Sequence, residues 1–421
     1  MTSRRGFLKA GGLALFGIGV GGVPTFIARA ANSEKTTALY KKRKIMVCIF
    51  QRGAMDGLMA VTPFTDENLR AARPTLFMSA AKASTGNPLI DLDGRFGLHP
   101  AMRAFQPLFS EKRLAIVHGI GSPNNTRSHF DAQDYMEAGT PFNKGTASGW
   151  LNRAVGLLGH DATPFRAVSL TSSMPRSFYG DNPSVAISNL QDFAIQMRGN
   201  PAGANLAAKS FEDLYDKTSS GLLKQTGKES FDAVKLLQKT DTKNYQPSNS
   251  AIYPNSALGN SLKQIAQLIK MDVGLEVAFA ESGGWDTHFN QGTEQGVFAR
   301  NVTDLSNSIS AFWTDMDSYQ DDVTVMTMTE FGRTVKQNGS GGTDHGRGSC
   351  NFILGNDVNG GVVHGNLKSL SIENLEDGRD LPVTTDFRSV FSEVADKHLM
   401  IHNDRILFPD WTGQKIGVMH S

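Results

Sequence analysis

Six residues of types that bind metal ions lie beside apolar segments of the chain. They are four carboxylates and two histidines: Asp56, Asp286, His288, Glu330, Asp344 and His345. If they lie close together, the negative charges raise one another's pKa values, and one or two divalent cations would neutralise them. Oxygen and imidazole ligands without thiolate suit zinc, manganese, magnesium or calcium. The sequence therefore predicts a metal site, provided that the fold gathers these residues.

Each of these residues also has a purely structural interpretation. Asp56 can belong to a turn, and Asp286 can cap a helix. Glu330 can pair with Arg333, three residues later, in the first turn of a helix. His345 can be an ordinary loop histidine. The joint placement of the six residues beside successive apolar segments is what favours the metal site.

Five apolar segments have the composition of strands that are buried on both faces of a parallel sheet. They are residues 45–50, 114–117, 275–279, 323–328 and 351–354. Helical patterns lie between them, at roughly 99–110, 128–138, 149–158, 256–272 and 294–317. This alternation predicts an α/β fold with a mainly parallel, doubly wound sheet. Because such sheets bind ligands at the carboxyl ends of their strands, the six residues are expected at that edge.

The first thirty residues, 1–30, predict an export signal. Arg4 and Arg5 form a twin-arginine pair, a Gly-rich apolar stretch runs to Ile27, and Ala28 and Ala30 suit signal peptidase. The apolar stretch is short and rich in glycine, which makes it a poor membrane-spanning helix. We therefore expect cleavage after Ala30, export to the periplasm by the twin-arginine machinery, and no stable membrane span afterwards.

The rest of the chain is predicted to form one domain, residues 44–421. Residues 31–43 are polar and basic and suggest a tether, and residues 190–255, roughly, suggest a helical insertion. Lys and Arg number 42 against 41 Asp and Glu, and this balance argues against nucleic acid as a partner. Cys48 and Cys350 both lie in apolar segments, so two buried, reduced thiols are expected rather than a disulfide or a cysteine-ligated zinc site.

Three motifs resemble those of a known family. They are Gly284-Trp285-Asp286-Thr287-His288, Thr329-Glu330-Phe331-Gly332-Arg333-Thr334 and Gly342-Thr343-Asp344-His345-Gly346. In this order they look like a bacterial family of twin-arginine-exported proteins of unknown function, within the alkaline phosphatase/sulfatase-like superfamily. The resemblance covers nearly the whole mature chain. It implies an alkaline-phosphatase-like fold and the hydrolysis or transfer of phosphate or sulfate esters, with one or two metal ions.

The resemblance also assigns roles to single residues. Asp56 resembles the superfamily's first metal ligand, just past the first strand. Asp286 and His288 resemble a later Asp–His ligand pair, although only one residue separates them here. Ser128 stands where the superfamily has its nucleophile, at the start of a predicted helix.

Two registers compete for the last ligands that the resemblance implies. In the first, Asp344 and His345 form an Asp–His pair, and His364 is the final histidine. In the second, Glu330 and Phe331 stand at the places of the pair, and His345 is the final histidine. The second is favoured because the strand predicted at 351–354 follows His345 closely, and it leaves one metal site a ligand short.

Ser128 has both a catalytic and a structural interpretation. A helix N-terminus would stabilise an alkoxide or a phosphoryl oxygen there, and Arg127, His129 or Arg347 could hold the ester's non-bridging oxygens. Ser128 can equally be an ordinary N-cap, with Asp131 in a capping box. Neither cysteine begins a helix, so the formylglycine of true sulfatases has no evident precursor.

Two functions remain open from the sequence. The first is an exported metal-dependent hydrolase or transferase that acts on a small or polymeric phosphate or sulfate ester. The second is a catalytically silent, metal-binding envelope protein that uses the same fold. They differ at Ser128, whose removal would abolish ester hydrolysis only in the first.

Overall fold

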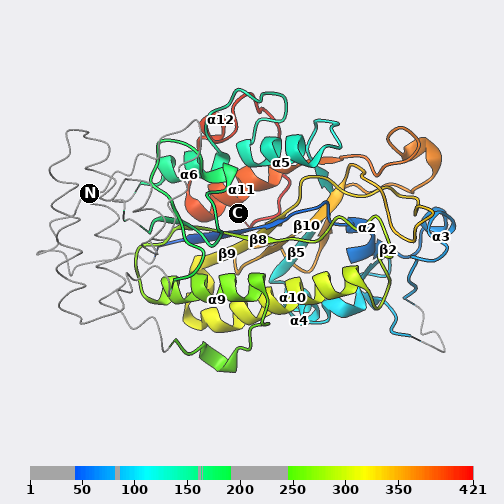
Figure 1. Cartoon of the computed structure of the whole chain (residues 1–421), viewed down its shortest axis with the longest axis horizontal. Helices are drawn as coiled ribbons and strands as arrows, with labels where there is room; N and C mark the ends of the chain where they lie inside the picture. The colour runs from blue at the N-terminus through cyan, green and yellow to red at the C-terminus, as the bar shows by residue number, and fades with distance from the viewer. Residues whose placement is uncertain (1–42, 81–85, 160–162, 164, 191–244, 421) are drawn as a thin grey trace, which may run out of the picture.

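The computed structural model describes residues 43–80, 86–159, 163, 165–190 and 245–420. The predicted signal peptide lies outside these residues, as do nearly all of the predicted tether and most of the predicted insertion. Within the described part of the chain, no helix combines the length and the apolar character needed to cross a membrane. The fold is mixed α/β and is built around a mostly parallel central sheet (Figure 1).

The central sheet contains nine strands among the described residues, in the order β11-β5-β10-β9-β1-β8-β6-β7, with β12 beside β5. The long strands are β1 (Ile45–Gln51), β5 (Leu114–Gly121), β8 (Val277–Ser282), β9 (Val323–Met328) and β10 (Ser349–Leu354). The short strands are β6 (Ala167–Ser169), β7 (Val185–Ala186), β11 (Val363–His364) and β12 (Thr385–Asp386). Each of the five predicted strands is therefore present, and the sheet is mostly parallel as predicted. β10 is the exception, because it runs antiparallel to both β5 and β9.

Helices cover both faces of this sheet (Figure 1). They are α4 (Phe105–Ser110), α9 (Ala257–Lys270) and α10 (Val297–Met316) on one face, and α5 (His129–Ala138), α6 (Trp150–Leu157) and α11 (Phe387–Leu399) on the other. β1 lies in the middle, and all its residues are buried. Its side chains alternate between the two cores, because successive residues of a strand point to opposite faces. Val47 and Ile49 belong to one core, and Cys48 and Phe50 to the other.

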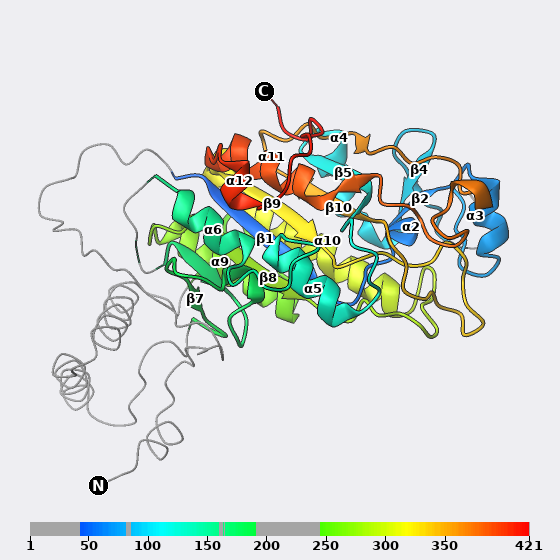
Figure 2. The ribbon, with the colours of Figure 1, turned by 90° about the horizontal axis from the view of Figure 1, so that it is seen from above.

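The predicted helices are recovered with small shifts at their ends, except for the one at 99–110. That segment divides into a short 3₁₀ turn (Pro100–Met102) and α4. A small antiparallel sheet, β2 (Val61–Pro63), β4 (Phe96–Leu98) and β3 (Ile90–Asp91), was not predicted. It lies with α2 (Gly57–Ala60) and α3 (Glu67–Ala72) at one end of the molecule (Figure 2).

Both cysteines are buried and free, as expected. Burial raises the pKa of the Cys48 and Cys350 thiols. Thiolates are the reactive and metal-binding form of cysteine, and neither residue forms one readily in these positions.

Strand direction explains which loops meet. β1, β8 and β9 are parallel and in register, so their carboxyl ends lie at the same edge of the sheet. β5 ends there too, because it runs in the same direction as β9. The reversed strand β10 begins at that edge. The loops after β1, β8 and β9, the start of α5 after β5, and the loop before β10 therefore come together.

Candidate metal centre

Three histidines and one aspartate converge at this edge of the sheet. The Nε2 atom of His345 lies 3.0 Å from Nε2 of His129 and 2.9 Å from Nε2 of His288. The Oδ1 atom of Asp286 lies 3.0 Å from Nε2 of His288, 3.2 Å from that of His345 and 3.5 Å from that of His129. His129 begins α5, Asp286 and His288 follow β8, and His345 precedes β10.

The other ring nitrogen of each histidine is already bound to an oxygen. Nδ1 of His129 lies 2.8 Å from Oε1 of Glu330, and Nδ1 of His288 lies 2.9 Å from Oδ1 of Asp344. Nδ1 of His345 lies 2.8 Å from the carbonyl oxygen of Arg127. A carboxylate or carbonyl oxygen can only accept, so each Nδ1 must carry the proton. In the neutral rings the three Nε2 atoms then present lone pairs, which point at one another and at a carboxylate oxygen.

Such a set of acceptors fits a cation. In a tetrahedral site with metal–ligand distances of about 2.0–2.1 Å, neighbouring ligand atoms lie about 3.3 Å apart. The spacings of 2.9 to 3.5 Å around Asp286 and His345 lie close to that value. Histidines whose second nitrogen donates to a carboxylate or carbonyl are typical of metal ligands. Three imidazoles and one carboxylate suit zinc or manganese better than magnesium or calcium, which prefer oxygen.

Glu330 supports the site from the buried side. Its carboxylate is completely buried, and Oε1 accepts hydrogen bonds from His129, from Nε2 of Gln133 at 2.9 Å and from the backbone N–H of Gly53 at 2.8 Å. Burial raises the pKa of Glu330, but the hydrogen bonds from His129 and Gln133 outweigh it, and the net pKa is lowered. The same hydrogen bond raises the pKa of His129. Glu330 is thus a charged acceptor that orients His129.

Gly53 allows the loops to approach this closely. Its φ is +116°, and a Cβ atom there would lie 2.6 Å from the backbone nitrogen of Asp286. Only glycine fits such a contact without a shift of the backbone. The loop after β1 thereby packs directly on the loop that carries Asp286 and His288.

Arg333 fixes the aspartate of the cluster. Its Nη1 donates to Oδ1 of Asp286 at 2.8 Å. Partial burial raises the pKa of Asp286, but the hydrogen bond and charge of Arg333 outweigh it, so the pKa lies below its usual value. The sequence interpretation that paired Arg333 with Glu330 in a helix is wrong, because the segment after β9 is not helical and the guanidinium crosses to the neighbouring loop.

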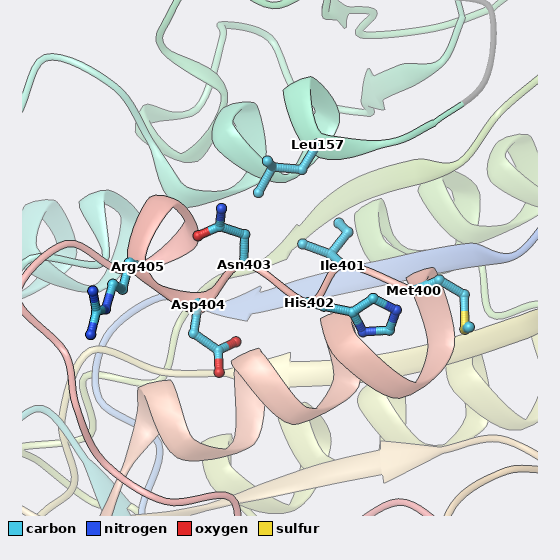
Figure 3. Close-up of a pocket in the computed structure, with 7 residues that line it drawn as sticks. All are labelled: Leu157, Met400, Ile401, His402, Asn403, Asp404 and Arg405. Carbon is cyan, nitrogen blue, oxygen red and sulfur yellow. The ribbon is translucent and has the colours of Figure 1, made fainter.

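The cluster is open to solvent on one side. The side chains of His129 and His345 are 24% exposed, His288 is 29% exposed and Asp286 is 46% exposed. A solvent-facing hollow of about 540 Å³ lies far from this edge, at the end of α11 (Figure 3). Residues 400–405 line most of it and follow His398 closely in the chain. Nε2 of His398 bonds the carbonyl of Ile45 at the N-terminal end of β1, whereas the cluster lies at the C-terminal end. The two sites are therefore separate.

The six predicted metal ligands take three different positions. Asp286, His288 and His345 contribute to the cluster directly. Glu330 and Asp344 lie one step behind, each holding a histidine. Asp56 differs from its predicted place, because both its oxygens are hydrogen-bonded by the buried guanidinium of Arg73, at 2.8 and 3.1 Å. An aspartate with a buried counter-ion of its own has no need of a metal ion.

The predicted substrate-binding residues are also arranged differently. His129 belongs to the cluster, where the sequence had given it only the ester oxygens. The guanidinium of Arg127 is bound to Asp380, with Nε–Oδ2 at 3.0 Å, and that of Arg347 to Glu376 at 2.9 Å. Neither arginine is thus a free cation in this structure. His129 could have been recognised as a ligand only if its proximity to His345 were known, and nothing local signals it.

Ser128 caps α5, and its Oγ accepts weakly from the N–H of Asp131 at 3.5 Å. It is exposed and directly precedes His129. The two registers can also be compared with the structure. His364 lies on β11 and bonds the carbonyl of Asn359, whereas Phe331 packs its ring against His129 and His345, with centroids 4.9 and 5.0 Å away. Phe331 and His345 therefore lie at the cluster, while Glu330 bonds His129 from behind it and His364 lies on another strand.

A family described as "Protein of unknown function (DUF1501)" matches residues 43–407. No curated protein matches the chain significantly. Among solved structures, a variant of TAB5 alkaline phosphatase with Mg bound is similar over 75% of this chain and 91% of its own, with 11% identity and a TM-score of 0.35. The alkaline phosphatase of the Antarctic bacterium TAB5 is similar over 75% of this chain and 93% of its own, with 11% identity and a TM-score of 0.31. The C-terminal periplasmic domain of EcEptC from Escherichia coli, in complex with Zn, is similar over 75% of this chain and 73% of its own, with 9% identity and a TM-score of 0.32.

Proposed function

The chain belongs to the DUF1501 family, whose function is unknown, and we propose that it is a metal-dependent hydrolase or transferase of phosphate or sulfate esters. The observation that carries this proposal is the convergence of three imidazole nitrogens and one carboxylate oxygen, each oriented by a hydrogen-bond partner, on the solvent-facing edge of the sheet. We propose His129, His288, His345 and Asp286 as the ligands, with Glu330 and Asp344 as their supports.

A bound divalent ion would supply a Lewis acid for the ester oxygen and lower the pKa of a coordinated hydroxyl. The protein contributes the fixed geometry and the side chains around it. We propose Ser128 as the nucleophile, since it is exposed, precedes a ligand and stands at the N-terminus of α5, where backbone N–H groups favour negative charge. Phe130 and Phe289 directly follow two of the ligands and are 90% and 72% exposed, so esters with an apolar or aryl group are suitable first substrates.

The experiment is a substrate screen with the zinc- or manganese-loaded chain, using 4-nitrophenyl phosphate, bis(4-nitrophenyl) phosphate and 4-nitrophenyl sulfate. We expect metal-dependent release of nitrophenol that His345→Ala abolishes and His364→Ala preserves, since His364 lies on β11 and its ring bonds the carbonyl of Asn359, away from the cluster. If firmly bound metal gives no turnover of any of the three, the hydrolase is refuted.

The second candidate is a catalytically silent metal-binding protein of the cell envelope. One observation favours it: four protein side chains converge at the cluster, and structural zinc sites usually take all four ligands from the protein, whereas catalytic sites keep a position open. Failure of the screen with a fully loaded centre is the outcome that this candidate predicts.

We further propose that the chain belongs to the alkaline phosphatase/sulfatase-like superfamily. The support is the order of the three motifs that contain Asp286, Glu330 and His345.

We also propose that the chain is exported to the periplasm by the twin-arginine machinery, with the first thirty residues removed. The support is the sequence pattern around Arg4 and Arg5. Replacing both with lysine should retain the full-length protein in the cytoplasm, which cell fractionation and immunoblotting would detect. Unchanged export of this variant would contradict the proposal.

A further inference from the structure

Arg333 is an arginine buried beside a metal ligand. Its side chain is 0% exposed, Nη1 donates to Asp286 at 2.8 Å, and Nε donates to the hydroxyl of Thr343 at 3.2 Å. Its other amino group, Nη2, is buried and has no hydrogen-bond partner among the described residues. A buried donor left unsatisfied destabilises the folded chain, so packing alone does not account for this residue.

A chain of buried polar groups holds Arg333 in place. Thr343 donates to Oε1 of Gln291 at 2.9 Å, and Nε2 of Gln291 donates to Oδ2 of Asp56 at 2.8 Å. Asp56 is in turn paired with Arg73. Because each member is buried and bonded to the next, the guanidinium cannot swing away when a cation approaches Asp286.

The net charge of the side chains around the cluster matches that of a single divalent ion. With an ion on their Nε2 atoms the histidines are neutral, so Asp286, Glu330 and Asp344 then bring three negative charges and Arg333 brings one positive charge. The net charge of minus two is cancelled by one divalent cation. A second ion would leave an excess of two positive charges beside a guanidinium, in a site where charges are only partly screened.

The other two carboxylates of the cluster already hold histidines. Oε1 of Glu330 accepts from three donors, and Oδ1 of Asp344 accepts from His288 and from Asn338 at 3.1 Å. Among the described residues, one group of at least three acidic, histidine or cysteine ligand atoms lies close enough to share an ion; it is His129, Asp286 and His345, with His288 bonded to the last two.

We infer that the centre holds one divalent ion and that Arg333 takes the place of a second cation beside Asp286. This inference rests on the metal centre proposed above and adds the number of ions and the residue that sets it. Arg333 is a positioning residue: it holds Asp286 toward the histidines, and its positive charge lies against Oδ1, the oxygen that faces them, which disfavours a further ion at this carboxylate.

The test counts ions independently of activity. The chelator-treated chain is titrated with Zn²⁺ by calorimetry and with Co²⁺ by visible absorption, whose intensity reports tetrahedral coordination. The wild type should bind one equivalent of each. Arg333→Gln, which removes the positive charge beside Oδ1 of Asp286, should bind a second and weaker equivalent, whereas Arg333→Lys should still bind one.

The outcomes separate this inference from the proposed function. Two equivalents in the wild type, or one equivalent in a correctly folded Arg333→Gln, would overturn the inference. No bound ion in the wild type would refute the metal centre itself. Circular dichroism checks the fold of each variant. If Arg333→Gln does not fold, the ion counts of the wild type and of Arg333→Lys still test the inference. Two equivalents in either protein would contradict a single-ion centre.

Discussion

At the scale of single residues, the site is defined by which ring nitrogen of each histidine is free. Glu330, Asp344 and the carbonyl of Arg127 each bind an Nδ1 atom, and this leaves three Nε2 atoms facing Asp286. Hydrogen-bond acceptors that face one another repel unless a cation or a proton lies between them. The residues that hold the ligands are therefore as informative as the ligands.

Removing one ligand should empty the centre. We predict that His345→Ala loses bound zinc, because Nε2 of His345 contacts all three other ligand atoms. His364→Ala is the matched control and should retain the wild-type content. Metal analysis by plasma mass spectrometry measures both, and equal zinc in the two variants would show that the ion is bound elsewhere.

Removing a support should weaken the centre without emptying it. We predict that Glu330→Gln lowers the affinity for zinc about 10–100-fold, the usual effect of losing a group that orients a metal ligand. Competition with a chromogenic chelator gives the affinity. Glu281→Gln is the control, because Glu281 pairs with Arg52 at the same sheet edge and contacts no histidine among its described partners. An unchanged affinity in Glu330→Gln would contradict the role given to this carboxylate.

Asp56 should behave as a structural residue. We predict that Asp56→Asn costs about 3–5 kcal/mol of unfolding free energy, because it leaves the charge of Arg73 buried and uncompensated. Urea denaturation measures this loss. The folded fraction should still bind zinc, whereas a stable variant that has lost its metal would restore Asp56 as a ligand.

At the scale of elements, the strands were predictable because an apolar run buried on both faces has few other interpretations. The segments 45–50 and 323–328, for example, match β1 and β9 almost residue for residue. The reversed direction of β10 leaves no trace in its composition. It matters nonetheless, because it carries His345 to the edge where the other strands end.

The ligand set was only partly predictable, for the same reason. Asp286, His288 and His345 stand out because they follow or precede strands. The partner of Arg333 was not predictable: the structural alternative paired it with Glu330, three residues away in sequence, whereas Asp286 is its neighbour only in the folded chain. His129 looked like the first residue of a helix, and the sequence does not show that this helix begins against the loop before β10.

The start of α5 offers a test of the nucleophile. We predict that Ser128→Asn keeps the stability of the protein, since asparagine caps helices as well as serine does, but loses the proposed ester hydrolysis. Ser128→Ala should lose both the activity and about 1 kcal/mol of stability. Thermal unfolding and nitrophenol release are measured side by side. Full turnover by Ser128→Asn would assign the serine to capping alone.

At the scale of the whole molecule, three buried histidines tie stability to pH. Burial lowers the pKa of His99, His118 and His398 to about 4 in each case. The unfolded chain, with its ordinary histidine pKa, therefore binds more protons than the folded chain between about pH 6.5 and 4. Their contribution to stability is complete above that range and is lost as the pH falls through it, on the order of 3 kcal/mol for each residue.

We therefore predict that the unfolding free energy of the metal-free protein falls steeply from pH 7 to pH 4.5. Urea denaturation at several pH values gives the slope. A flat profile would mean that the three histidines are not held in neutral form.

The central claim is that one metal ion sits among His129, His288, His345 and Asp286. The most direct measurement is anomalous diffraction at the zinc absorption edge from crystals of the zinc-loaded chain. We expect a single strong peak between the three Nε2 atoms and Oδ1 of Asp286. An absent peak at that position, or a peak held by other residues such as Asp56, would contradict it.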